Sequence, residues 1–248
     1  MYKRQGPNGR IVTVDVESFF PTATVGPKAV PFSRMRKAIA QNLLYSKQNI
    51  PHFYSKCTVD AEAFFNLYSR VKEQFRCTVN DFIVLSCARA LRRFPAFLQQ
   101  YHDNQLVEFS DVNIGIAVGT DEGLTVPVLM CADKLSLKEL SEASRRLVEN
   151  ARNGRLEGVG QGIFTITNLG MFGIEEFSAI INPPESAILA VGSIRDHFKV
   201  VDGTIVAGKA MTMVLSSDHR VIDGVVAAQF LQTVKESLEN PYSLVEMR

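Results

Sequence analysis

Sustained patterns of apolar and polar residues begin near Ser33 and continue to the end of the chain. Apolar residues three and four positions apart predict helices, over residues 34–48, 61–75, 79–93, 137–152 and 224–239. Short alternating or continuous apolar runs predict strands, over residues 52–60, 112–118, 124–130, 163–169, 186–194 and 207–217. Because helices and strands do not alternate in regular βαβ units, the pattern favours an α+β fold over a doubly wound α/β fold.

Polar residues at the predicted element boundaries suit helix caps and a turn. Asp60 and Thr78 are expected N-caps, since their side-chain oxygens can accept hydrogen bonds from free backbone N–H groups. Ser136 and Glu139 fit a capping box at the start of the fourth predicted helix. The turn "TDEG" lies between two apolar runs and predicts a hairpin.

The first 30 residues lack sustained patterning. Pro, Thr, Gly and Val without helical periodicity are typical of a linker, which we place at residues 21–30. A single domain is expected to follow at residues 31–248.

Composition and charge narrow the class of protein. The chain has 248 residues, of which 46% are hydrophobic, and a formal net charge of +1. This near-neutral balance gives no electrostatic reason to expect nucleic acid or an anionic membrane. No apolar run approaches the roughly 20 residues that a membrane helix needs, and the amino end lacks the apolar core of a signal peptide. The four cysteines are widely separated, which favours free thiols in a reducing compartment over disulfides or a metal site. These features predict a soluble intracellular protein.

One histidine, in the stretch "SSDHRVIDG", is a candidate catalytic base. His219 ends a long apolar strand, where a side chain is held rigidly, and an imidazole readily takes a proton from a thiol or an alcohol. The alternative is an ordinary strand-to-helix turn, with Asp223 as an N-cap and Gly224 at the start of the last helix. The motif alone leaves both interpretations open.

Such chemistry also needs a hydrogen-bond donor that stabilises the negative charge developing on a carbonyl oxygen. Thr167 in "FTITNLGMFG" is a candidate, at the end of another strand and next to Asn168. The alternative is a strand threonine that leads into a glycine-rich turn.

Other candidate motifs are weaker. The glycines of "GVGQG" follow a helix and precede a strand, whereas a dinucleotide-binding loop follows a strand and opens a helix. His102 and His197 lack the spacing of metal ligands, while His52 remains an open candidate at a helix-to-strand junction. Cys87 lies among apolar helical neighbours and is expected in the core. No metal site is predicted.

Several long motifs occur together and in order: "VPFSRMRKAIAQNLLYSKQNIPHFY", "TVNDFIVLSCARAL", "NIGIAVGTDEGLTVPV", "FTITNLGMFGIEEFSAIINPPESAILAVGSI" and "DHRVIDG". Over residues 31–248 they closely resemble the catalytic domain of the dihydrolipoamide acyltransferases, the E2 cores of 2-oxo acid dehydrogenase complexes. The run "NLGMFGIEEFSAIINPP" is most similar to the pyruvate dehydrogenase branch.

The resemblance implies a chloramphenicol-acetyltransferase-like fold in trimers that join into a hollow cage, with active sites between subunits. His219 would take the proton of the coenzyme A thiol, and Thr167 would donate its hydroxyl to the tetrahedral oxyanion. Many members have serine at this position, so Thr167 keeps the hydroxyl but adds a methyl group that restricts χ1. Asp223 would hold the loop and the histidine in position.

Further contacts to coenzyme A follow from motif position alone. The resemblance implies that they are made by Arg70, Thr78, Thr167, Asn168, Gly192 and Ile194. An arginine near a helix N-terminus suits phosphate, and a solvated surface charge is the equal alternative for Arg70.

The amino end resembles the closing third of a peripheral-subunit-binding domain, which recruits the E1 or E3 component in a full-length protein. We place this truncated remnant at residues 1–20. About 20 residues are fewer than the roughly 40 at which domains fold alone, so we expect the remnant to be flexible and unable to recruit a partner. The lipoyl group would be carried on a domain absent from this chain, which looks like part of a longer protein.

The leading interpretation is transfer of an acyl group, acetyl by resemblance, from S-acyldihydrolipoyl-lysine to coenzyme A. The alternatives are a non-catalytic cage or E3-tethering scaffold and a branched-chain or 2-oxoglutarate type of acyltransferase. Acetylation of an antibiotic is disfavoured by the binding-domain remnant and by "NLGMFG". The retained His219 and the hydroxyl at position 167 favour the enzyme. The expected location is the cytoplasm, or the mitochondrial matrix in a eukaryote.

Overall fold

A computed structural model describes Thr13, residues 27–120 and residues 123–246. The chain divides into two units, Met1–Ser33 and Arg34–Arg248, and the helices and strands below belong to the second. The remnant predicted at residues 1–20 and most of the predicted linker lie outside the described residues, so both assignments stay predictions.

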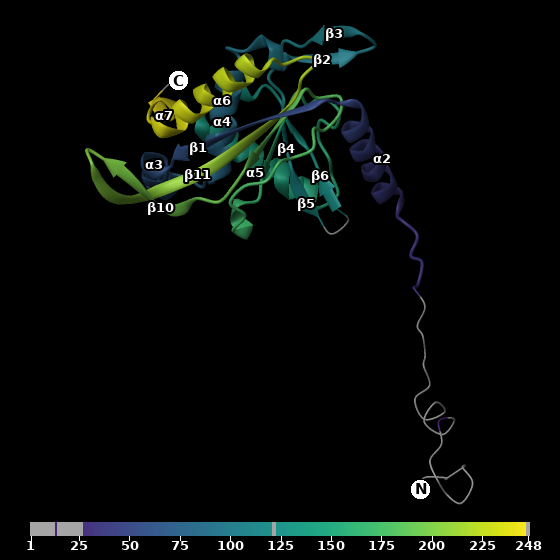
Figure 1. Ribbon diagram of the computed structural model, residues 1–248, viewed down its shortest axis with the longest axis horizontal. Helices are drawn as coiled ribbons and strands as arrows, with labels where there is room; N and C mark the ends of the chain where they lie inside the picture. Colours follow the sequence, from purple (N-terminus) through teal and green to yellow (C-terminus); the bar gives the residue numbers. More distant parts are fainter. Residues whose placement is uncertain (1–12, 14–26, 121–122, 247–248) are drawn as a thin grey trace, which may run out of the picture. The chain divides into compact units, whose positions relative to one another are not determined.

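One mixed sheet organises this unit (Figure 1). Its strands follow the order β1, β11, β9, β8, β4, β7, and β10 pairs with β11 beside this path. Their bounds are β1 (His52–Asp60), β4 (Ile114–Ile116), β7 (Val128–Leu129), β8 (Phe164–Asn168), β9 (Ala187–Val191), β10 (Arg195–Val201) and β11 (Thr204–Asp218). Strand β8 is parallel to both β4 and β9, and the other pairings are antiparallel. The α+β prediction is therefore confirmed, with a mixed sheet.

Two small antiparallel pairs lie outside this sheet. One joins β5 (Val118–Thr120) to β6 (Gly123–Thr125), and the other joins β2 (Gln99–His102) to β3 (Gln105–Glu108). The first pair, with the pairing of β4 and β7, confirms the hairpin predicted around "TDEG". The second was not predicted, because its short strands carry too few apolar residues to show alternation.

Helices occupy the places that the apolar periodicity predicts. Their bounds are α2 (Arg34–Asn49), α3 (Glu62–Gln74), α4 (Val79–Leu91), α5 (Leu137–Arg152), α6 (Gly224–Glu239) and α7 (Ser243–Glu246), with 3-10 turns η2 (Pro95–Leu98), η3 (Ala132–Lys134) and η4 (Gly170–Phe172). Figure 1 shows α6 running beside β1 and β11, against which it packs.

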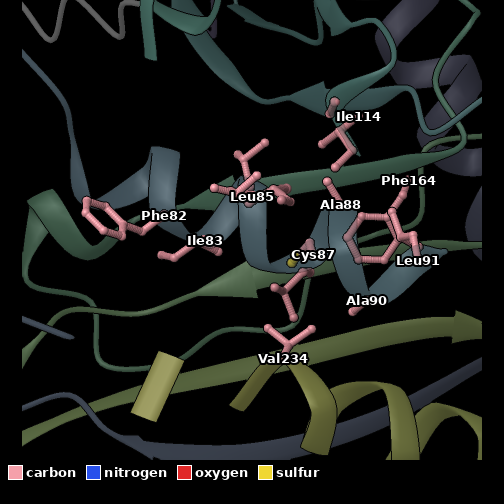
Figure 2. Packing of buried hydrophobic residues seen from close by; sticks show 14 of the residues in the cluster. Phe82, Ile83, Leu85, Cys87, Ala88, Ala90, Leu91, Ile114, Phe164 and Val234 are labelled. Carbon is pink, nitrogen blue, oxygen red and sulfur yellow. The ribbon is translucent and has the colours of Figure 1, made fainter. Parts of the chain in front are cut away.

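The main core lies between the helices and one face of the sheet. Helix α4 is at its centre, and almost every residue from Asp81 to Leu91 is buried. Figure 2 shows its side chains between Ile114 and Phe164 of the sheet and Val234 of α6. Burial of so much apolar surface at about 25 cal/mol per Å² fixes the helices against the sheet.

The opposite face of the sheet carries a smaller cluster. Val214 of β11 and Ile188 of β9 pack there against Ile181. Since successive side chains of a strand point to opposite faces, Phe164 and Ile166 in the main core place Thr165 and Thr167 on this second face. The candidate oxyanion donor therefore lies on the face of the sheet opposite to α3, α4, α5 and α6.

The predicted caps are confirmed at two helices and wrong at a third. Thr78 and Ser136 each form a complete capping box, with Asp81 and Glu139 respectively. At α3 the cap position is Ala61, because the backbone of Asp60 still pairs with β11 as the last residue of β1. The Asp60 carboxylate nevertheless accepts a hydrogen bond from the backbone N–H of Glu62 at 3.2 Å.

The single strand predicted at residues 186–194 is interrupted. Strand β9 ends at Val191, and β10 begins at Arg195. At the break, the Gly192 N–H still donates to Thr212 of β11, but the Ser193 N–H turns to the carbonyl of Ile174. A Cβ on Gly192 would lie 1.9 Å from the carbonyl oxygen of Glu175, so only glycine allows this close approach.

Candidate active site

His219 is the first residue after β11, and its side chain is exposed. Its backbone N–H donates to the carbonyl of Pro51 at 3.0 Å, which ties the end of β11 to the start of β1. The imidazole contacts the ring of Phe53 edge to face, with centroids 5.1 Å apart. The prediction that this histidine ends a long apolar strand is confirmed, and the ring is available to a ligand.

Asp223 occupies the N-cap position of α6, but its side chain accepts no hydrogen bond from that helix. Its backbone carbonyl accepts from the N–H of Ala227. The cap position predicted from the sequence is therefore confirmed, while the carboxylate is exposed and makes no capping contact. Its predicted part in holding the histidine stays a prediction.

Thr167 and Asn168 end β8 and are half-buried. The Asn168 Oδ1 accepts from the backbone N–H of Gly170 at 2.8 Å, and the Asn168 Nδ2 lies 3.5 Å from the Asn80 Oδ1. The Leu169 N–H donates to the carbonyl of Val191 at 3.1 Å. These bonds fix the direction in which the chain leaves β8.

Within one chain the candidate base and the candidate hydroxyl donor are far apart. Thr167 pairs with Ala190, and Ala190 pairs with Val214 two strands away from β8. His219 follows Val214 by five residues, so it lies about 16 Å farther along the strand and about 10 Å across the sheet from Thr167. No side chain spans that separation, so a contact between them requires a second copy of the chain.

Several of the predicted coenzyme A contacts gather at one place. The end of β8, the break after β9 and the first turn of α4 meet there, since Asn168 reaches Asn80. The Thr78 hydroxyl is engaged in its capping box, where it donates to the Asp81 carboxylate at 2.9 Å. The sequence did not single out Asn80. Its only signal was an amide side chain in the first turn of a capped helix.

Arg70 lies elsewhere, in a pocket of about 610 Å³ beside α3 and α6. Three carboxylates, those of Asp60, Glu62 and Glu239, line this pocket with Arg70 and Lys199. The Arg70 Nη2 lies 3.5 Å from the Tyr242 hydroxyl. None of the other predicted contacts lines this pocket, and the assignment of Arg70 to a phosphate stays a prediction.

His52, which the sequence left open, is a structural link. Its Nε2 accepts from the backbone N–H of Ile181 at 3.1 Å, so its Nδ1 carries the proton and donates to the carbonyl of Ile50 at 2.8 Å. Burial lowers the pKa of His52 from its usual value of 6.5, which favours this neutral form.

Cys87 is fully buried in the main core, as predicted, and burial raises the pKa of its thiol. All four cysteines are free.

A buried carboxyl group, that of Glu185, was missed by the sequence analysis. It is 3% exposed, accepts from the Thr165 hydroxyl at 2.6 Å and accepts from the Asn182 amide at 2.9 Å. Burial raises the pKa of Glu185 to about 7. The sequence offers no signal for this, because a glutamate after two prolines is typical of an exposed loop.

Residues 25–246 match the family model of the 2-oxoacid dehydrogenases acyltransferase (catalytic domain). The chain belongs to this family. Among curated acyltransferase relatives, it is 35% identical to the dihydrolipoyllysine-residue acetyltransferase component of the pyruvate dehydrogenase complex of Rickettsia felis, over 96% of this chain. It is 38% identical to component 2 of the mitochondrial complex of Arabidopsis thaliana, over 98% of this chain.

The chain spans 62% of the length of the Rickettsia felis protein and 50% of the Arabidopsis thaliana protein. It therefore corresponds to part of each of these curated acyltransferases.

Solved acyltransferase structures have the same fold. A probable dihydrolipoamide acetyltransferase from Listeria monocytogenes superposes with a TM-score of 0.82 at 34% identity, covering 88% of this chain and 96% of the other. The Azotobacter vinelandii dihydrolipoamide acetyltransferase, studied for the role of a serine, a histidine and an asparagine in its catalytic mechanism, gives 0.83 at 32%, over 90% and 96%. Chloramphenicol acetyltransferase, at 12% identity and a TM-score of 0.53, shares the fold, as the sequence resemblance implied.

In the described residues, no helix has both the length and the apolar character to cross a membrane.

Proposed function

We propose that this acyltransferase domain transfers an acetyl group from S-acetyldihydrolipoamide to coenzyme A. The observation that carries the proposal is a matched spacing of three side chains. In the Azotobacter vinelandii enzyme the serine precedes the histidine by 52 residues, and the asparagine follows it by 4. Thr167 precedes His219 by 52 residues in this chain, and Asp223 follows it by 4.

The reaction begins with the coenzyme A thiol, whose proton passes to the imidazole of His219. A free thiol has a pKa of about 8.5 and a free imidazole about 6.5, so the transfer is uphill by only about 3 kcal/mol. The thiolate attacks the thioester carbonyl carbon, and a tetrahedral intermediate forms. When it collapses, the carbon–sulfur bond to dihydrolipoamide breaks, and the leaving thiolate takes the proton back from the imidazolium.

Thr167 donates its hydroxyl to the oxyanion of this intermediate. Such a donor lowers the barrier by about 3–4 kcal/mol when it is positioned before the charge develops. Thr167 is a threonine where the Azotobacter vinelandii protein has a serine at the matched spacing. The extra methyl restricts χ1, and the half-buried setting at the end of β8 restricts the hydroxyl further.

The active site lies between two copies of the chain, in a homotrimer. The separation of His219 from Thr167 within one chain supports this arrangement, because the imidazole and the hydroxyl act on the same carbonyl. The place where the ends of β8 and β9 meet the start of α4 provides the coenzyme A contacts, through Asn168, Gly192, Ile194 and Thr78.

The larger assembly is a cage built from such trimers. A structure with a TM-score of 0.83 and 31% identity is the cubic core of a pyruvate dehydrogenase multienzyme complex, which supports a cage here. The acetyl donor is a lipoyl group on a further domain, and E1 and E3 components complete the complex. Bacterial and mitochondrial relatives support a place in the bacterial cytoplasm or the mitochondrial matrix.

The test is formation of acetyl-coenzyme A from coenzyme A and free acetyl-dihydrolipoamide. We expect His219→Ala to lower kcat by at least about 100-fold, because the general base is lost. Thr167→Val keeps the shape but loses the hydroxyl, and should lower kcat by about 100- to 1,000-fold, while Thr167→Ser retains most of the rate.

Equal rates for the wild type and His219→Ala would overturn the catalytic proposal and favour a scaffold. Rates with acetyl, succinyl and branched-chain donors, compared at equal concentration, test the acyl group. A preference for succinyl or branched-chain donors would reject the acetyl assignment.

A further inference from the structure

The turn that carries His219 is built around an ion pair whose carboxylate is buried and whose guanidinium is partly exposed. Asp218 precedes the histidine, and its carboxylate side chain is 3% exposed. Arg220 follows the histidine and returns to the same carboxylate, with Nε 3.0 Å from Oδ1 and Nη2 2.7 Å from Oδ2. Two parallel bonds of this kind fix the plane of the guanidinium relative to the carboxylate.

The backbone of the same turn is also fixed. The N–H groups of Val221 and Ile222 donate to the carbonyl of Asp218, and the N–H of Asp218 donates to the carbonyl of Ser186 at 2.8 Å. Neither these bonds nor the charge pair touches the imidazole. Within the described part of one chain, the ring of His219 has the Phe53 ring contact and makes no hydrogen bond.

A third side chain, from a distant part of the sequence, packs against the ion pair. The guanidinium carbon of Arg220 lies 4.0 Å from the ring centroid of Tyr101, a distance at which a cation stacks on an aromatic face. Tyr101 belongs to β2, and its hydroxyl is hydrogen-bonded to Asn104 on the same hairpin. The Tyr101 ring therefore covers one face of the guanidinium.

The hairpin that carries Tyr101 is itself anchored beside the turn. The Ser186 hydroxyl donates to the carbonyl of Gln99 at 2.5 Å, and the Gln100 Nε2 donates to the carbonyl of Gly162 at 3.2 Å. Ser186 thus holds β2 through its side chain and Asp218 through its backbone carbonyl. This shared residue fixes the ring of Tyr101 relative to the start of the turn.

We propose that Tyr101 is a positioning residue for His219. Its ring stacks on the guanidinium of Arg220 and so acts through the ion pair of Asp218 and Arg220. The proposal rests on the proposed acetyl transfer, in which His219 is the base. Asp218 and Arg220 flank the histidine on both sides, so a change in the plane of the guanidinium changes the course of the backbone between them. Tyr101 limits that change by covering one face of the guanidinium.

The test compares Tyr101→Ala with Tyr101→Phe in steady-state acetyl transfer. We expect Tyr101→Ala to lower kcat by about 10- to 100-fold, since a displacement near 1 Å has an effect of this size. The KM values for coenzyme A and acetyl-dihydrolipoamide should stay within about twofold of the wild type. Tyr101→Phe keeps the aromatic face and should restore kcat.

Phe65→Ala is the matched control, because it removes another aromatic face under a cation, with Lys209 Nζ 5.1 Å from the ring centroid. It should leave kcat unchanged. A Tyr101→Ala protein with a lowered melting temperature and an unchanged kcat would overturn the proposal, and so would a rise in KM alone. Equal losses in Tyr101→Phe and Tyr101→Ala would also overturn it.

A second measurement separates this proposal from the proposed function. The rate at which diethyl pyrocarbonate modifies His219, followed by mass spectrometry, reports the setting of the imidazole without acetyl transfer. Failure of wild-type transfer would reject the function. In that case a changed modification rate in Tyr101→Ala, but not in Tyr101→Phe, would still support the positioning, and equal rates in all three proteins would reject it.

Discussion

In the part of the chain that the structure describes, the buried carboxyl group of Glu185 has no cationic partner. Among the described residues its two hydrogen-bond donors are neutral, the hydroxyl of Thr165 and the amide of Asn182. Burial raises its pKa from 4.5 to about 7, because transfer of a charged carboxylate from water is unfavourable and the two bonds only partly offset this. The folded protein therefore binds the proton of Glu185 more tightly than the unfolded chain does.

This pKa predicts a pH dependence of stability. The contribution of Glu185 is fully present below about pH 4.5 and is lost as the pH rises from 4.5 through 7, by about 3 kcal/mol in total. Glu185→Gln stays neutral, and its amide group can still pair with Thr165 and Asn182. We expect the free energy of unfolding of the variant, relative to the wild type, to rise between pH 5 and pH 8.

Urea unfolding at fixed protein concentration, repeated across this range, measures the difference. Glu142→Gln is the matched control, because Glu142 is exposed on α5 and should give no such rise. A constant difference between Glu185→Gln and the wild type would contradict the raised pKa.

At the scale of elements, helix α4 connects the stability of the core to the candidate coenzyme A contacts. Its length is buried between the sheet and α6, whereas its first turn reaches the end of β8 through Asn80 and Asn168. Helix α5 begins with the same kind of capping box, formed by Ser136 and Glu139. Each box stabilises a helix start by satisfying backbone N–H groups that have no partner within the helix.

The two boxes allow a paired prediction. Thr78→Ala and Ser136→Ala should each lower the free energy of unfolding by about 1 kcal/mol, since each removes a side-chain cap. Thr78→Ala should also raise the KM for coenzyme A, and Ser136→Ala should leave it unchanged. Thermal unfolding and steady-state kinetics on both variants provide the two measurements. Equal KM values would remove Thr78 from the coenzyme A contacts.

At the scale of the whole molecule, one chain does not assemble the candidate site. The register of β8, β9 and β11 places Thr167 and His219 at different levels of the sheet. Thr167 points to the face opposite to α3, α4, α5 and α6, where Tyr54 and Lys56 of β1 are exposed. A second copy on that side can bring its own histidine to this hydroxyl.

Coexpression of two impaired variants tests the shared site. Thr167→Val retains a histidine and His219→Ala retains a hydroxyl, so a mixed trimer contains some interfaces with both groups. Random mixing in equal amounts should restore about a quarter of the wild-type rate, while each variant alone keeps about 1% of that rate or less. Mixed trimers without activity would place both groups of each site in one chain. Size-exclusion chromatography of two differently tagged chains checks that mixing has occurred.

The sequence by itself determined most of the elements. Apolar periodicity located α2 through α6, and the cap residues at Thr78 and Ser136 marked two helix starts, because these signals depend on neighbours within a few positions. Placement at the ends of apolar strands and side-chain chemistry singled out His219 and Thr167 as candidates, and the family resemblance implied their roles. The short hairpin of β2 and β3 was not predicted, since its strands are too short to show an alternating pattern of apolar and polar residues.

Only the tertiary structure decided how distant residues meet. The strand order, the break at Gly192, the burial of Glu185 and the stacking of Tyr101 on Arg220 all depend on segments far apart along the chain. The wide separation of Thr167 and His219 also follows from strand register, and neither motif contains information on that register. Local pattern determines which elements form, whereas pairing and packing between elements determine which side chains can act together.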